Sequence, residues 1–146
     1  MASLSQLETL IDLARRESDD AAKRLGAALK MVDDSEQKLD VLVGYRNDYA
    51  VRFENSLAAG MTPMAYRNFQ AFLDKLDHAV KGQVQAVQYA RKRSEQEKAA
   101  WQAAERKRMS YTTLETRALQ EAMRVEAKRD QKAMDEHAAR QAYYKR

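Results

Sequence analysis

Most positions at alternating steps of three and four residues, from Leu4 to Ser56, carry apolar side chains. Twelve of the sixteen positions in this series are apolar or aromatic, and the register never slips. A heptad seam sustained over about seven repeats is typical of a coiled coil rather than of an ordinary surface helix. The same spacing resumes from Phe69 to Ala90 and continues more loosely from Trp101 to Val125.

One short segment interrupts the pattern and predicts a turn at 58–62. Gly60 can adopt the left-handed backbone conformation that ends a helix. Thr62 offers a side-chain oxygen as an N-cap, and Pro63 suits the first helical position because no amide donor is needed there. We therefore expect an all-α chain forming a single domain over 1–146, an antiparallel coiled-coil hairpin of two helices at about 4–57 and about 63–142.

The second predicted helix is longer than the first, so part of it has no partner. Folding back about the turn places side by side residues whose numbers add up to about 121, so that Tyr45 faces Leu76. Leu4 then lies near Arg117, and about the last 28 residues overhang. Since an unpaired helix gains no stability from packing, we expect this overhang to fray or to pack against another molecule.

Composition and charge are consistent with this architecture. Of the 146 residues, 33% are charged, and the chain has four glycines, one proline and no cysteine, which favours long helices and excludes disulfides and thiolate metal sites. Residues 1–60 hold 8 basic and 11 acidic side chains, net −3, whereas residues 61–146 hold 18 and 11, net +7. No apolar run approaches the roughly 18–20 residues of a membrane span, and the start lacks the features of a signal peptide. These features predict a soluble, cytoplasmic protein.

The sequence offers no convincing catalytic, cofactor or metal site. His78 and His137 lie 59 positions apart, and their acidic neighbours are expected by chance in a chain so rich in acids. There is no glycine-rich phosphate loop, and a two-helix hairpin provides no concave pocket for a substrate. Basic clusters at 91–93 and 106–108 alternate with glutamates, whereas surfaces that track phosphates keep acids off the binding face. We therefore predict a non-enzyme that binds proteins.

Aromatic residues indicate where a partner binds. Five of them gather on either side of the predicted turn, and a single seam cannot bury them all: Tyr45, Tyr49, Tyr66, Phe69 and Phe72. An exposed apolar patch on a soluble protein usually marks an interaction surface. We expect such a patch near the turn.

Several segments follow one another in a characteristic order and spacing: the opening 7–14, the run 19–26, the segments 42–49 and 68–80 on either side of the turn, and 129–136 near the end. Together they resemble the FliJ family of the flagellar type III export apparatus. The resemblance spans nearly the whole chain. It implies a stalk-like coiled coil, similar to the central stalk of rotary ATPases, that inserts its paired termini into the hexameric export ATPase, FliI.

The resemblance further implies contacts with the cytoplasmic domain of the export gate protein, FlhA, with the regulator of the ATPase and with export chaperones. It implies a peripheral location at the inner face of the cell membrane, and a role in flagellar biogenesis, motility and chemotaxis. The residues that it assigns to gate binding are Lys38, Leu42, Tyr45, Tyr49, Phe72, Leu76, Ala79 and Gln83. Those assigned to ATPase binding are Leu4, Leu7, Ile11, Ala14, Trp101, Tyr111 and Met134.

Two alternatives stay open at this point. The first is a stalk or chaperone-escort coiled coil of a non-flagellar type III secretion system, which would form the same hairpin but contact a different gate. The second is a basic coiled coil that binds nucleic acid.

Overall fold

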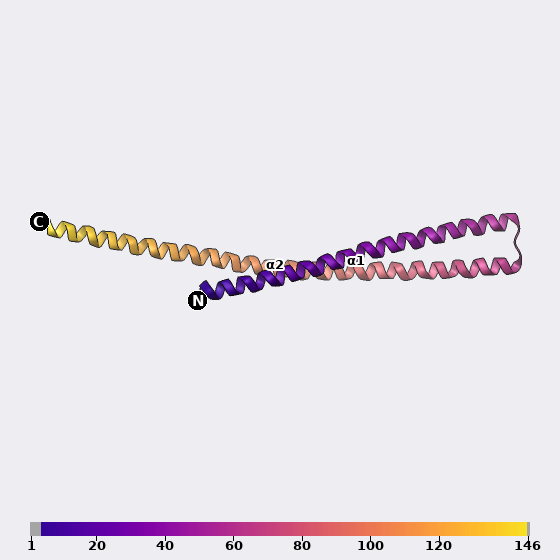
Figure 1. Ribbon diagram of the computed structural model, residues 1–146, viewed down its shortest axis with the longest axis horizontal. Helices are drawn as coiled ribbons and strands as arrows, with labels where there is room; N and C mark the ends of the chain where they lie inside the picture. Colours follow the sequence, from indigo (N-terminus) through magenta and orange to yellow (C-terminus); the bar gives the residue numbers. More distant parts are fainter. Residues whose placement is uncertain (1–3, 146) are drawn as a thin grey trace. The chain divides into compact units, whose positions relative to one another are not determined.

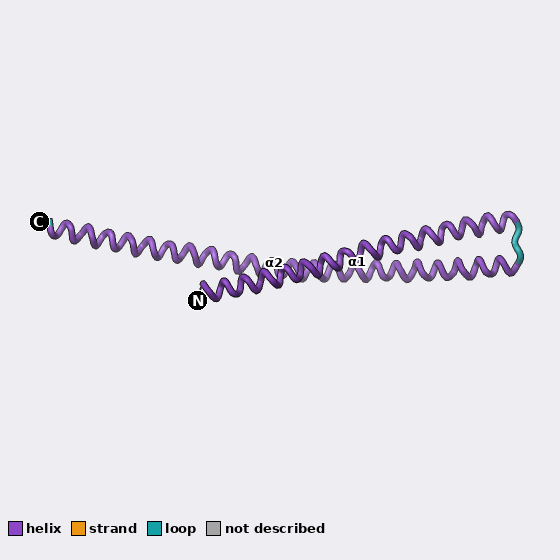
Figure 2. Tube along the Cα trace, viewed as in Figure 1, coloured by secondary structure: helices purple, strands orange, loops and turns teal. Residues whose placement is uncertain are grey.

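The computed structural model describes residues 4–145, and nearly all of them are helical. Helix α1 spans Leu4–Ala59 and helix α2 spans Pro63–Tyr144 (Figures 1 and 2). The described residues contain no strand. Each helix extends two residues beyond the end expected from the sequence, a difference of the size that fraying helix ends produce. The chain is an all-α antiparallel coiled-coil hairpin in which α2 is the longer helix.

The turn between the helices follows from three residues. Gly60 has a φ of 99°, in the left-handed region that favours glycine, and its N–H donates to the carbonyl of Leu57 at 3.2 Å. The Thr62 hydroxyl accepts a hydrogen bond from the Ala65 N–H at 3.2 Å and so caps α2, with Pro63 in its first turn. A helix stop and a helix start therefore follow each other directly.

The chain divides into two compact units. One, the turn unit, is Asp20–Trp101, and the other, the terminal unit, is Met1–Asp19 together with Gln102–Arg146. Each unit contains a stretch of both helices paired along the heptad seam, and each is described here by itself.

The seam side chains of the turn unit change from aromatic near the turn to small farther from it. Near the turn, Phe53 packs on Tyr66 and Phe69 with ring centroids 5.4 and 5.7 Å apart. Farther from the turn the buried seam positions are mostly small, with Ala21 only 1% exposed and Ala28 and Ala90 each 5%. Bulky aromatic packing thus gives way to a tightly packed alanine seam.

Ion pairs between the helices accompany the seam of the turn unit. Arg46 pairs with Asp77 at 3.4 Å, Glu36 with Arg91 at 2.7 Å and Arg24 with Glu97 at 3.5 Å. All three pairs are partly exposed, and such pairs contribute about 0–1 kcal/mol each. Their main effect is to favour one register of the hairpin.

The terminal unit buries its seam only where α1 is present. Leu7, Ile11, Ala14 and Ser18 are 7%, 6%, 1% and 2% exposed. On α2, by contrast, every residue from 121 to 145 is exposed. This stretch is the predicted C-terminal overhang, and its helix has no partner among the described residues.

Candidate protein-binding surfaces

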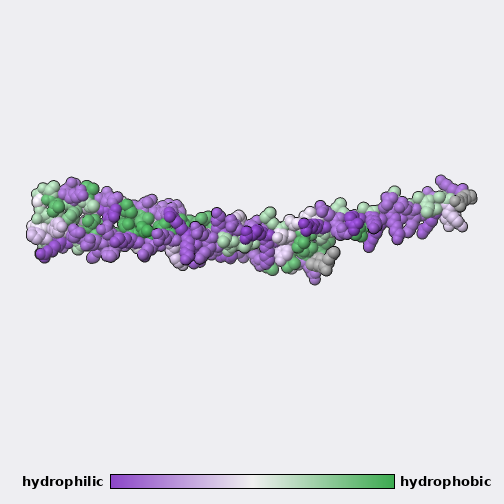
Figure 3. Space-filling model, turned by 180° about the vertical axis from the view of Figure 1, so that it is seen from behind, coloured by the Kyte–Doolittle hydropathy of each residue, from purple (hydrophilic) through white to green (hydrophobic). Residues whose placement is uncertain are grey.

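The aromatic residues near the turn form a partly open cluster in which Tyr49 is the central ring. Its centroid lies 5.2 Å from that of Phe69 and 4.6 Å from that of Phe72. Phe69 is half-buried in the seam, whereas Phe72 is 46% exposed and Tyr45 is 62% exposed. Figure 3 shows hydrophobic side chains gathered over the end of the hairpin next to the turn. Part of the cluster is therefore available to a partner.

Four of the eight residues assigned to gate binding line one hollow of about 400 Å³, which we call the turn-side hollow. It is lined by Tyr45, Asp48, Tyr49, Arg52, Phe72 and Leu76. The sequence analysis did not select Asp48 and Arg52. Their position three and seven residues after Tyr45, on the same side of α1, was the signal that could have found them.

Two further gate-assigned residues, Lys38 and Gln83, line a second hollow of about 470 Å³, the mid-hairpin hollow. Its walls include Asp34, Gln37, Lys38, Val41, Gln83 and Ala86. The Gln83 side-chain amide donates to the Ser35 carbonyl on the other helix at 3.0 Å. Leu42 is half-buried and Ala79 is exposed. Six of the eight gate-assigned residues therefore divide between two hollows, and Leu42 and Ala79 line neither.

The residues assigned to ATPase binding lie in different environments. Leu7, Ile11 and Ala14 are buried between the helices, whereas Leu4 is 40% exposed and Met134, on the overhang, is 68% exposed. Tyr111 is half-buried, and so is Trp101, which belongs to the turn unit. While the hairpin is intact, Ile11 and Ala14 can support a binding surface but cannot touch a partner, whereas Leu7 also lines a hollow.

A larger hollow of about 1070 Å³ lies where α1 begins, in the terminal unit. Its apolar lining is formed by Leu4, Leu7, Leu114, Ala118, Ala122 and Val125. The heptad series of α2 passes through the last three of these positions and then becomes polar at Arg129. The hollow therefore lies where the heptad series of α2 continues beyond Leu4, the first residue of α1.

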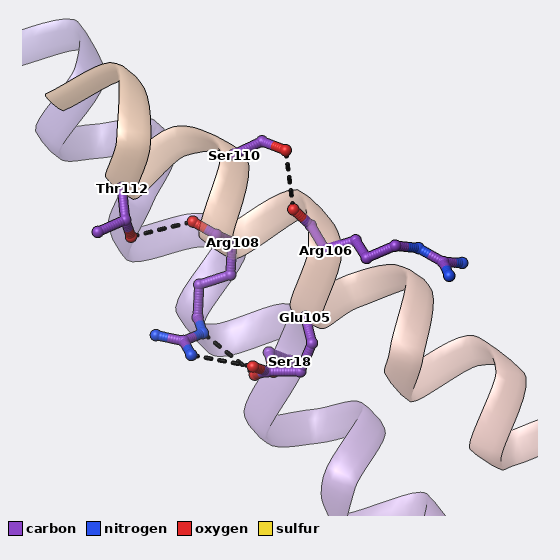
Figure 4. A network of polar contacts seen from close by, with 6 residues as sticks. All are labelled: Ser18, Glu105, Arg106, Arg108, Ser110 and Thr112. Carbon is purple, nitrogen blue, oxygen red and sulfur yellow. Dashed lines mark hydrogen bonds and ion pairs between the residues drawn. The ribbon is translucent and has the colours of Figure 1, made fainter. Parts of the chain in front are cut away.

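A polar network crosses the seam in the terminal unit (Figure 4). The buried Ser18 hydroxyl donates to the Glu105 carboxylate, which also accepts from the Arg108 guanidinium at 3.1 and 2.9 Å. Arg108, and after it Ser18, hold the pKa of Glu105 below its usual range. A polar contact inside an alanine-rich seam specifies register, because sliding one helix would leave the hydroxyl without a partner.

Replacing Ser18 with alanine is expected to raise the pKa of Glu105 toward its ordinary value, because the carboxylate loses one hydrogen bond that favours its charged form. Arg108 still keeps the pKa lowered. Carbon-detected NMR titration of the glutamate carboxyls measures the change. Glu121 is the internal control, since its pKa is lowered by Arg124 alone and should not move.

The same network gives a direction for the pH dependence of stability. A carboxyl whose pKa is lowered by folding stabilises the folded state above its unfolded pKa of about 4.3, and this contribution is lost as the pH falls through the lowered folded pKa. The contribution of Glu105 should therefore disappear over an acidic range that begins near that value and should be smaller in Ser18→Ala. An unchanged Glu105 pKa in the variant would contradict the network.

Within residues 4–145 the structure provides no cluster of three or more metal-ligating side chains. No helix in that part of the chain is long and apolar enough to cross a membrane. The surfaces available for function are thus the sides of a helical pair, its hollows and the overhang.

Two long antiparallel helices paired along a heptad seam define a coiled-coil hairpin with exposed apolar surfaces. The family model described as "Flagellar FliJ protein" matches residues 3–146, and the chain belongs to this family. Two relatives, each named "Flagellar FliJ protein", cover 99% of this chain and are themselves covered to 99%. The one from Salmonella typhi is 33% identical over 146 residues and the one from Escherichia coli (strain K12) 31% over 145.

Among solved structures, a chain from Chlamydia trachomatis described as a YscO homologue matches with a TM-score of 0.46 and 18% sequence identity. The match covers 92% of this chain and 88% of that one. This distant likeness carries no argument about function.

Proposed function

We propose that this protein is a non-enzymatic component of the flagellar type III export apparatus that joins two partners. Its terminal unit inserts into the hexameric export ATPase, and the side of its turn unit that carries the turn-side hollow contacts the cytoplasmic domain of the export gate. Membership of the flagellar FliJ family supports a role in the flagellar export apparatus rather than in a non-flagellar type III secretion system.

The observation that carries the gate assignment is the turn-side hollow. Tyr45 and Phe72 are exposed beside Tyr49, whose ring is fixed by the neighbouring aromatics. Aromatic side chains held in a preformed hollow are the usual anchors of protein interfaces, because little conformational entropy is lost when a partner covers them. Charged groups at Asp48 and Arg52 provide the polar rim.

The ATPase assignment rests on the terminal unit. A pair of helices is narrow, about 10–12 Å for each helix with its side chains, and so suits the central hole of a ring. Leu4 and the exposed overhang, including Met134, offer direct contacts. Leu7, Ile11, Ala14 and Tyr111 hold the coil together and so determine its shape. Trp101 is half-buried in the turn unit and has the same supporting role.

In this role the protein supports assembly of the ATPase, energy coupling, contacts with its regulator and the handling of export chaperones. It is cytoplasmic and peripheral to the inner face of the cell membrane at the flagellar base. Cells that lack it are expected to be defective in flagellar biogenesis, and hence in motility and chemotaxis.

Replacing Phe72 with alanine tests the gate surface. We expect about a tenfold or greater loss of affinity for the purified gate domain, because truncating an aromatic anchor at an interface typically costs at least 1–2 kcal/mol. Affinity for the hexameric ATPase, measured in parallel, should stay unchanged since Phe72 lies in the turn unit. Met64→Ala is the matched control, because Met64 is 74% exposed near the turn but lines neither hollow of this unit.

The same experiment separates the alternatives. If Phe72→Ala leaves both gate binding and motility intact, the gate surface is wrongly placed. If the wild-type chain binds neither the ATPase nor the gate but binds arbitrary DNA with steep salt dependence, the hypothesis of a nucleic-acid-binding coiled coil replaces the proposal.

A further inference from the structure

The two hollows of the turn unit are lined by residues on one side of the hairpin, and together they define what we call the groove. On α1 their walls include a series of residues that follow each other at steps of four and three: Asp34, Lys38, Val41, Tyr45, Asp48 and Arg52. On α2 the wall runs through Phe72, Leu76, Gln83 and Ala86 at the same kind of spacing. Residues at such steps lie on one line along a helix. The groove side therefore carries a second heptad row on α1, distinct from the seam.

The charges of this second row are available to a partner. The four charged members take part in no ion pair with any residue of the described chain: Asp34, Lys38, Asp48 and Arg52. Other charges of the turn unit are paired within the hairpin, as Glu36 is with Arg91 and Arg46 with Asp77. Between the free charges lie Val41 and Tyr45, which are 56% and 62% exposed.

An α-helix is the occupant that such a groove can take. Both walls are helices whose backbone groups are already hydrogen-bonded along the helix, so the groove offers no free edge to an extended peptide. A helix satisfies its own backbone groups and needs only side-chain complementarity. A helix that binds there must present charges that complement those of the second heptad row.

The charges of the second heptad row complement those of the same row in an antiparallel second copy. In an antiparallel pair of α1 helices with the two-fold axis level with residue 43, Asp34 meets Arg52 of a second copy and Lys38 meets its Asp48. Both layers join opposite charges, and each occurs twice because of the symmetry. A register displaced by one heptad would destroy this match. Charge complementarity thus selects both the occupant and its register.

The apolar positions of the row and the residues that line the two hollows support the same register. Val41 meets Tyr45 of the second copy, and farther out Ala27 meets Ala59. The α1 residues that line the turn-side hollow then face those that line the mid-hairpin hollow. Each hollow of one copy therefore receives the side chains around the other hollow of its partner.

We propose that this groove is a self-association surface, on which a second copy of this chain binds antiparallel through α1 to form a two-fold symmetric four-helix dimer. Its second heptad row, from Ala27 to Ala59, runs about 50 Å at 1.5 Å per residue. Because few of its layers are apolar, the dimer depends on concentration and on salt.

Sedimentation equilibrium of the full chain over about two orders of magnitude in protein concentration tests the proposal. We expect a monomer–dimer equilibrium that weakens between low and high salt. Arg52→Asp should raise the dissociation constant about tenfold, since it places an aspartate opposite Asp34 of the partner twice. Asp34→Arg should do the same. The double variant D34R/R52D should restore dimerisation, because the layer is attractive again with its polarity exchanged.

Two matched controls carry the same charge changes outside the groove. Asp40→Arg and Arg67→Asp alter exposed residues that line neither hollow, and they should leave the dissociation constant unchanged. A chain that stays monomeric at every concentration would overturn the proposal. So would single reversals that have no effect, or a double variant that fails to recover.

The dimer has a consequence that rests on the proposed function, because it covers Lys38, Tyr45 and the turn-side hollow, which are assigned there to the gate. Excess gate domain should then convert the dimer into a complex with one copy of this chain, in proportion to its affinity. If the gate domain binds the dimer without dissociating it, the gate surface is wrongly placed while the dimer stands. If the dimer is absent but Phe72→Ala abolishes gate binding, the opposite holds.

Discussion

Truncating Phe69 to alanine is expected to remove about 2–3 kcal/mol from the free energy of unfolding, somewhat less than the 3–5 kcal/mol typical of a fully buried phenylalanine. Phe69 is half-buried and its ring contacts both Tyr49 and Phe53. These aromatic contacts are the bulkiest packing along a seam that otherwise contains many alanines. Their loss therefore affects a large share of the apolar contact that holds the turn unit together.

Urea denaturation followed by circular dichroism measures this change. Met64→Ala is the control, because Met64 is 74% exposed and should cost less than about 0.5 kcal/mol. If Phe69→Ala and Met64→Ala destabilise equally, the aromatic cluster does not contribute a large share of the stability of the turn unit. Loss of Phe69 should also loosen the ring of Tyr49 and so weaken gate binding indirectly.

Enlarging Ala21 to leucine is expected to destabilise the hairpin by about 1–3 kcal/mol through overpacking. Ala21 is only 1% exposed in the alanine seam, so the extra atoms fit only if the helices separate locally. Separation would also weaken the neighbouring ion pair between Arg24 and Glu97, whose atoms are 3.5 Å apart. In a wider coil the same substitution would add apolar contact and stabilise.

The neighbouring Ala22→Leu is the matched control, since Ala22 is exposed and the helix propensities of alanine and leucine are close. Thermal unfolding of the two variants should therefore differ by several degrees, with Ala21→Leu the less stable. A stability gain in Ala21→Leu would contradict the close approach of the helices at this point.

The heptad pattern predicted which residues face the other helix but not how deeply each is buried. Tyr49 and Ala14 occupy equivalent seam positions, yet Tyr49 is half-buried and Ala14 is 1% exposed. The difference arises because bulky rings hold the helices farther apart near the turn, whereas alanines let them approach. Burial depends on the side chains opposite, which the period of one helix does not specify.

The candidate surfaces, too, were predicted from the sequence only in part. The sequence indicated the aromatic patch, and the resemblance supplied residues for each partner. Neither showed that Lys38 and Gln83 lie in a different hollow from Tyr45, or that Ile11 and Ala14 are buried in the seam. Asp48 and Arg52 were missed because, on a chain with 33% charged residues, an exposed charge is not distinctive until its surroundings are known.

The sequence by itself determined the two helices, the turn at Gly60 and Thr62, and the antiparallel pairing, because heptad spacing and capping chemistry are local properties that each segment carries alone. Only the tertiary structure decided which charges are paired across the helices and which remain free along the groove. It also decided that Ser18 meets Glu105 across the seam. These outcomes depend on the distance and rotation between two helices, and those are set by all the facing side chains together.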